Sequence, residues 1–213
     1  MLFSIVDLTS AAFFLGLAHA FEADHMVAVS ALVSESKGVR HSSLQGLLWG
    51  LGHTATLVAA GAVLLALKLV IPVPLMHFFE SLVGVMLLIV GVGVIYRSLR
   101  SAPHMHSDSH HHHSHRHRRS LMVGMVHGLA GTGALMLLAV GSASSFMGGM
   151  LFIMTFGVGS IAGMLLASTA FGIPLHLVSS RFAFAERVIP TCAGICSILL
   201  GTSIIYGNVM IYL

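Results

Sequence analysis

The chain has 213 residues, of which 56% are hydrophobic and only 8% are charged, and its formal net charge is +3. In soluble domains about a quarter of the residues are charged, so this composition excludes a soluble protein. It indicates an integral membrane protein with no nucleic-acid partner. A helix needs about 20 apolar residues to cross ~30 Å of hydrocarbon, which leaves room for six spans and one sizeable loop in this chain.

Six apolar segments follow one another along the chain, and each predicts a transmembrane helix. They cover residues 7–34, 42–69, 73–98, 121–140, 145–171 and 188–213. The first contains "LAHA", which resembles a signal-peptide cleavage site, but no Lys or Arg precedes Lys37. Because a signal peptide begins with a basic region, we expect a retained span. The predicted fold class is all-α, a polytopic membrane protein with six transmembrane helices.

The basic residues predict how these helices are oriented. If all six segments cross the membrane, the connecting loops alternate between its two sides, and every Lys and Arg except Lys68 falls on one side. Basic loops stay in the cytoplasm. We therefore expect the N- and C-termini to lie outside.

The two halves of the chain resemble each other. "GLAHAFEADHMVAVSA" from Gly16 resembles "GMVHGLAGTGALMLLA" from Gly124, "GLGHTA" resembles "GVGSIA", and "GVGVIY" resembles "GTSIIY", in the same order. A three-helix unit repeated once must be inverted in the bilayer, which is typical of secondary transporters with a site near the midplane. We expect two inverted three-helix repeats, residues 1–100 and 120–213, joined by a cytoplasmic His-rich loop at 101–119.

The first segment contains the clearest functional signal. "HAFEADH" places His19, Glu22, Asp24 and His25 within seven residues of an apolar helix. A carboxylate near the bilayer centre costs ~2.5 kcal/mol or more, so it persists where pairing or function compensates. At ~100° per residue, Asp24 projects from a different flank than the other three. It would either orient an imidazole on a neighbouring helix or join the metal ligands if the helix distorts.

Two histidines in later segments are further candidate ligands. His53 lies in "GLGHTATL", at a depth similar to that of His25, and His127 begins "HGLAGTG". The glycines after His127 either weaken the helix and expose carbonyl groups or, as we favour, allow close packing. Imidazole together with carboxylate suits borderline divalent ions such as Ni²⁺, Co²⁺ and Zn²⁺. The alternative is a structural cluster held by hydrogen bonds.

These motifs resemble those of the nickel/cobalt transporter (NiCoT) family, because "HAFEADH" fits H-x4-D-H and "LGHTATL" follows on the next helix. "HGLAGTGAL" and the six-helix length are more similar to its urease-accessory nickel permease branch. The resemblance implies that His19, Asp24 and His25 recognise the metal and that His53 contributes to the site. Longer members of the family have eight helices and often Asp where Glu22 stands, a difference that bears on metal preference.

The connection between the two halves is rich in histidine. It has no apolar periodicity, so we expect it to be disordered. Neutral imidazoles chelate borderline metals, and we expect the loop to collect or sense metal, the alternative being a flexible spacer. Its histidines are His104, His106, His110, His111, His112, His113, His115 and His117.

The sequence therefore predicts a cell-membrane permease for Ni²⁺ or Co²⁺ without a prosthetic group, and the resemblance favours uptake. The expected partners are the metal ion, the lipid bilayer and a cytoplasmic metallochaperone. Alternatives are efflux by the same architecture, metal sensing without transport, and an intramembrane zinc-dependent enzyme. "HAFEADH" contains neither H-E-x-x-H nor H-x-x-E-H, and no Ser or Cys lies beside a positioned base, so an enzyme is not expected.

Overall fold

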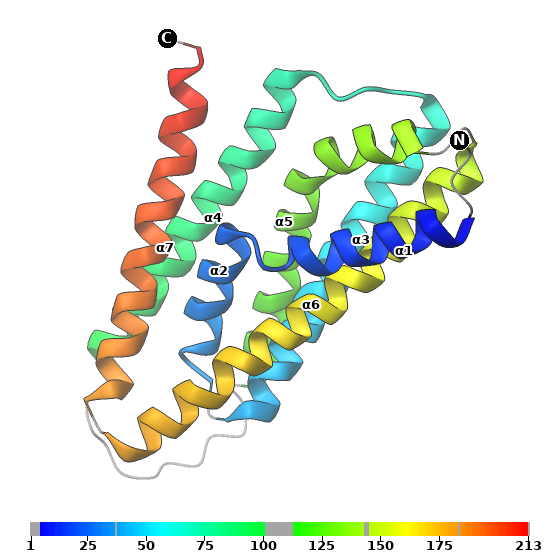
Figure 1. Cartoon of the computed structure of the whole chain (residues 1–213). Coiled ribbons are helices and arrows are strands. Elements are labelled where there is room, and N and C mark those ends of the chain that lie inside the picture. The colour runs from blue at the N-terminus through cyan, green and yellow to red at the C-terminus, as the bar shows by residue number, and fades with distance from the viewer. Residues whose placement is uncertain (1–4, 37, 101–112, 143–144, 183, 213) are drawn as a thin grey trace.

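The computed structural model describes residues 5–36, 38–100, 113–142, 145–182 and 184–212. These parts of the chain contain no strand, which confirms the predicted all-α class. Their seven helices are arranged as shown in Figure 1 and are α1 (Ile5–His19), α2 (Ala23–Val33), α3 (Val39–Leu67), α4 (Val73–Arg100), α5 (His113–Ser142), α6 (Phe146–Arg181) and α7 (Ala185–Met210).

Four of the described helices are long and apolar enough to cross a membrane. They are α3, α4, α6 and α7, with 29, 28, 36 and 26 residues. Large apolar side chains point outward from them, such as Ile89, which is 69% exposed, and Leu199, which is 65% exposed. Water would oppose a continuous apolar surface of this kind, whereas lipid accepts it. The chain is therefore an integral membrane protein.

The first predicted helix is divided in two, so the expectation of one continuous helix over 7–34 is wrong. α1 ends at His19 and α2 begins at Ala23. Figure 1 shows α1 lying across the other helices, whereas α2 takes a different direction and packs against α6 and α7. The bend is supported by α6, because the hydroxyl of Ser160 donates a hydrogen bond of 3.2 Å to the carbonyl oxygen of Gly16.

The fifth helix begins earlier than predicted. α5 starts at His113, so residues 113–119, which we expected to be disordered, are helical. Extending an existing helix adds one backbone hydrogen bond for each residue that is ordered. The extension is also held by Arg119, which donates a hydrogen bond of 3.1 Å to the carboxylate of Glu35.

Glycine brings α4 and α7 into close contact at two points. A Cβ atom added to Gly91 would lie 2.6 Å from the carbonyl oxygen of Gly194, and one added to Gly194 would lie 2.9 Å from that of Gly91. Gly84 and Gly201 approach each other in the same reciprocal way, at 2.8 and 2.6 Å. Only glycine allows backbones to pack this closely.

The contacts between the two halves involve equivalent residues. Adding 110 to 84 and 91 gives 194 and 201. Replacing each glycine by its counterpart at this offset therefore turns the contact of Gly91 with Gly194 into the contact of Gly201 with Gly84. Elsewhere, Gly16 of α1 packs on the backbone of Phe156 in α6, and Gly124 of α5 packs on the backbone of Trp49 in α3. Gly124 and Phe156 are the counterparts of Gly16 and Trp49 at offsets of 108 and 107. These contacts of α1 with α6 and of α5 with α3 therefore join positions that the repeat predicted from the sequence would pair.

Candidate metal centre

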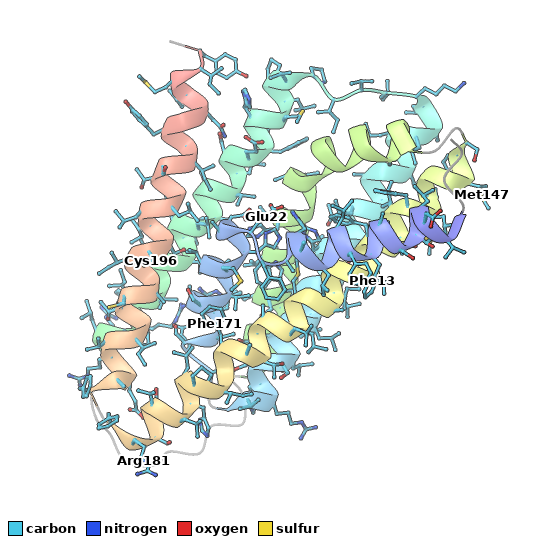
Figure 2. The ribbon with its side chains drawn as sticks, in the orientation of Figure 1. Phe13, Glu22, Met147, Phe171, Arg181 and Cys196 are labelled. Atoms are coloured by element: carbon cyan, nitrogen blue, oxygen red, sulfur yellow. The ribbon has the colours of Figure 1, made fainter. Side chains whose placement is uncertain are left out.

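Four histidines from four helices meet inside the protein. His19 ends α1, and His25, His53 and His127 lie in α2, α3 and α5. The ring centroids of His25 lie 4.5 Å from those of His19 and His127, and 5.4 Å from that of His53. Figure 2 shows Glu22 where α1 and α2 meet.

Glycines of α5 bring its backbone next to the histidines of the first half. Gly128 packs on the backbone of His53, and a Cβ atom added to Gly131 would lie 3.8 Å from Nε2 of His19 and 3.9 Å from the ring of His53. α5 remains helical through this stretch. The close packing that we favoured for Gly128 is confirmed, and the helix is not unwound after His127.

His25 is the centre of the cluster. Its side chain is 1% exposed, and its Nδ1 lies 3.0 Å from Oδ1 of Asp24. Its Nε2 is buried and has no hydrogen-bond partner. The ring stacks on the indole of Trp49, with 5.5 Å between centroids and an interplanar angle of 15°. Trp49 therefore holds the imidazole plane while Asp24 holds one edge of the ring.

Asp24 contacts histidines on two helices. One carboxylate oxygen reaches His25, and the other lies 3.5 Å from Nε2 of His127. Because α2 begins at Ala23, Asp24 lies in its first turn, where the free backbone N–H groups of a helix favour a negative charge. The bend between α1 and α2 thus moves Asp24 from the separate flank expected for a continuous helix into the cluster.

The buried imidazoles are not satisfied by protein hydrogen bonds. Both ring nitrogens of His53 and Nδ1 of His127 are buried without a hydrogen-bond partner, and Nε2 of His127 has only the contact of 3.5 Å with Asp24. A buried polar group that lacks its hydrogen bond costs about 1–3 kcal/mol, and a structural cluster would be expected to satisfy these atoms. The arrangement therefore favours a site that takes up a ligand over a purely structural cluster.

Two groups of three side chains have the spacing of metal ligands among the described residues. One consists of His19, His25 and His53, and the other of Asp24, His25 and His127. Within each group, the candidate ligand atoms lie within 4.8 Å of one another. Of the six residues predicted for the membrane site, five belong to these groups.

Glu22 is the predicted site residue that lies outside both groups. It occupies the N-cap position of α2 without a capping hydrogen bond from its side chain, and its carboxylate lies 3.0 Å from Nδ1 of His19. Its side chain is 59% exposed, whereas those of Asp24 and His19 are 29% and 17% exposed. The cluster is therefore open on the side of Glu22 and buried beyond Asp24.

The predicted loop ligands are only partly covered by the structure. His113, His115 and His117 lie in the first turns of α5, and the Nδ1 of His117 is buried without a hydrogen-bond partner. The other five lie outside the described residues, and they are His104, His106, His110, His111 and His112.

Sequence reasoning missed the role of Trp49. This residue is 1% exposed, and its ring also contacts His127 at 5.4 Å between centroids. Its indole N–H is buried without a hydrogen-bond partner. The available signal was its position in "GLLWG", four residues before His53 and so one helical turn away on the same face.

Comparison with known proteins identifies one similar sequence over nearly the whole chain. The urease accessory protein UreH of Bacillus sp. (strain TB-90) is 34% identical over 211 residues, which cover 95% of this chain and 92% of that protein. No family model matches the chain, and no solved structure is similar to it.

Proposed function

The chain belongs to the family of the urease accessory protein UreH, and we propose that it is a permease that carries Ni²⁺, with Co²⁺ as a second substrate, across the cell membrane. This relationship confirms the resemblance to the urease-accessory branch, which we inferred from the motifs of the chain. An accessory protein also agrees with the expectation that the chain is not an enzyme.

The observation that carries this proposal is the pair of three-residue groups in the interior of an apolar protein. Four imidazoles and one carboxylate supply mainly nitrogen ligands, which favour borderline divalent ions over Mg²⁺ and Ca²⁺. The carboxylate of Asp24 offsets part of the charge of a dehydrated cation. Polar side chains at such depth are expensive and mark ion pathways in membrane proteins.

The proposed topology is six crossings in two inverted repeats, with both termini outside. The reciprocal contacts of α4 with α7, and those of Gly16 and Gly124, support this arrangement because each maps onto its partner at the repeat offset. α1 and α2 then form the two halves of the first crossing. Transporter sites are commonly built from such discontinuous helices, with the N-terminal end of a half-helix at the site.

Uptake is the proposed direction. From its open side at Glu22, α2 leads to Glu35, which pairs with Arg97 and Arg119 at the basic end of the protein. Basic ends face the cytoplasm, so the open side faces the exterior. An ion would enter beside Glu22 and His19 and leave toward the cytoplasm, where the His-rich loop and a metallochaperone would receive it. Efflux through the same site is the alternative.

Metal content of cells tests the function. Cells that express the native chain should accumulate more nickel than cells with an empty vector, and His25→Ala should abolish the difference. His176→Ala is the matched control, because His176 is exposed near the end of α6. Lower nickel in native cells would indicate efflux, and equal nickel at matched expression would reject transport of this ion. Measuring cobalt, zinc and manganese in the same samples identifies the preferred metal.

A further inference from the structure

His25 belongs to both candidate ligand groups, and this sharing has a chemical consequence. A neutral imidazole has one nitrogen with a free lone pair, while the other carries the proton. His25 can therefore bind one ion at a time. Because the two groups place the remaining ligands on different helices, α1 and α3 for His19 and His53 and α5 for His127, an ion bound by one group is not at the centre of the other.

We propose that one metal ion occupies two adjacent positions in turn, first between His19, His25 and His53, then between Asp24, His25 and His127. The inference rests on the proposed transport function and adds a pathway within its site. His25 stays bound while the ion exchanges the ligands of one group for those of the other. A divalent ion stripped of all ligands in a medium of low dielectric is very unfavourable, and a shared ligand avoids that state.

The two positions differ in charge. The position at Asp24 includes a carboxylate, whereas the position at His19 and His53 has imidazoles alone. Attraction between opposite charges is strong in a poorly solvated site, so the position at Asp24 holds the ion more tightly. Conduction requires binding that is strong enough for entry and weak enough for exit, which several sites in series achieve. His19 contacts the exposed side chain of Glu22, so the position at His19 and His53 receives the ion. His127 follows Arg119 by about two turns of α5, which places the position at Asp24 nearer the basic end and makes it the position of exit.

The similarity between the two halves of the chain also supports two separate metal positions. His19 and His127 are counterparts at the repeat offset of 108. His19 contacts Phe156 at 5.5 Å between ring centroids, and His127 contacts Trp49, the counterpart of Phe156, at 5.4 Å. His19 belongs to one ligand group and His127, its counterpart in the other half, belongs to the second group. Because both groups share His25, this placement gives two related metal positions on either side of that residue.

Trp49 provides a local probe of the two positions, because it is the single tryptophan of the chain. Its ring contacts His25 and His127. Ni²⁺ and Co²⁺ quench indole fluorescence at short range, so an ion beside His127 should quench Trp49 more strongly than an ion between His19 and His53. The readout reports binding without any transport.

The experiment titrates Ni²⁺ into the full chain purified in detergent, with binding measured by equilibrium dialysis and by Trp49 fluorescence. In every form tested, Ser replaces the eight loop histidines from His104 to His117, because that loop is itself expected to chelate Ni²⁺. His53→Ala and His127→Ala should each bind one ion per chain, weakened about tenfold, which corresponds to about 1.4 kcal/mol. Both should lose cellular uptake. Quenching should be strong in His53→Ala and weak in His127→Ala. His25→Ala should bind no ion, and His176→Ala should behave as the native chain.

Three results would overturn the two positions. Loss of all binding in both His53→Ala and His127→Ala would indicate a single shared shell. Two ions per chain in the form that lacks only the loop histidines would show that His25 is not a common ligand. Equal quenching in the two variants would place the ion at one point. A variant that elutes as an aggregate is replaced by the corresponding His→Gln change. Failure of the proposed function would instead appear as absent uptake by the native chain.

Discussion

Asp24 both supplies a negative charge to the candidate metal site and orients a neighbouring histidine. It is the one carboxylate within either ligand group of the described chain, and it also fixes the ring of His25 through Nδ1. Its own backbone lies in the first turn of α2, which stabilises its charge. Charge and orientation can be separated by substitution, because asparagine keeps the shape and removes the charge.

Asp24→Asn should reduce nickel uptake at least about tenfold, which corresponds to about 1.4 kcal/mol of lost attraction for the ion. The reason is that the amide still contacts His25 but no longer offsets the charge of a dehydrated cation. Uptake of ⁶³Ni²⁺ in cells with matched expression measures the effect. Asp7→Asn is the control, since Asp7 is an exposed carboxylate in α1. Native uptake by Asp24→Asn would show that the charge is not needed.

At the level of elements, the bend between α1 and α2 decides the geometry of the site. The residues at the bend, "AFE", contain neither Pro nor Gly, so no local signal ends the helix there. The bend is held by tertiary contact instead. Ala20 is fully buried, and a Cβ atom added to Gly163 of α6 would lie 2.6 Å from that of Ala20. Single-sequence periodicity does not contain this information.

The part of the site that depends on spacing along one helix was therefore predictable, and the part that depends on packing was not. H-x4-D-H marked His19, Asp24 and His25, and a histidine on the next segment marked His53. Asp24 was assigned to a separate flank because a straight helix was assumed. The contact of His127 with Asp24 depends on how α5 packs against the first half, and the sequence offered only a histidine followed by glycines.

The glycine contacts between α4 and α7 make a second prediction for the elements. Gly91→Ala should lower the thermal stability of the protein in detergent, because its new Cβ would lie 2.6 Å from the carbonyl oxygen of Gly194. Overpacking of this kind costs about 1–3 kcal/mol. Circular dichroism during heating measures the shift.

Gly207→Ala is the control in α7, the other helix of the pair. A Cβ atom added to Gly207 would meet no atom within 4 Å. Both changes gain the same helix propensity of about 1 kcal/mol, so the difference between them isolates the contact with α7. Equal melting temperatures would mean that the two helices separate easily at this crossing.

For the whole molecule, the cluster is open on one side and closed on the other. On the closed side, the carboxylate of Glu35 receives hydrogen bonds of 2.6 and 3.0 Å from Arg97 and one of 3.1 Å from Arg119. Glu35 follows α2, Arg97 belongs to α4 and Arg119 to α5. These ion pairs therefore connect the two halves of the chain at the basic end. Under the uptake proposed above, this is the end that opens to release the ion.

Glu35→Gln should loosen the closed end, because a neutral amide cannot hold two guanidinium groups together. The side chain of Glu35 is 16% exposed, and that of Arg119 is 28% exposed, so solvent screens their attraction only partly. Hydrogen exchange of the segment between α2 and α3 should become faster, while Glu186→Gln, an exposed carboxylate of α7, should leave it unchanged. In a double-mutant cycle with Arg119→Gln, melting should reveal a coupling of about 0.5–3 kcal/mol. Additive effects together with unchanged exchange would mean that this end is closed by apolar packing alone.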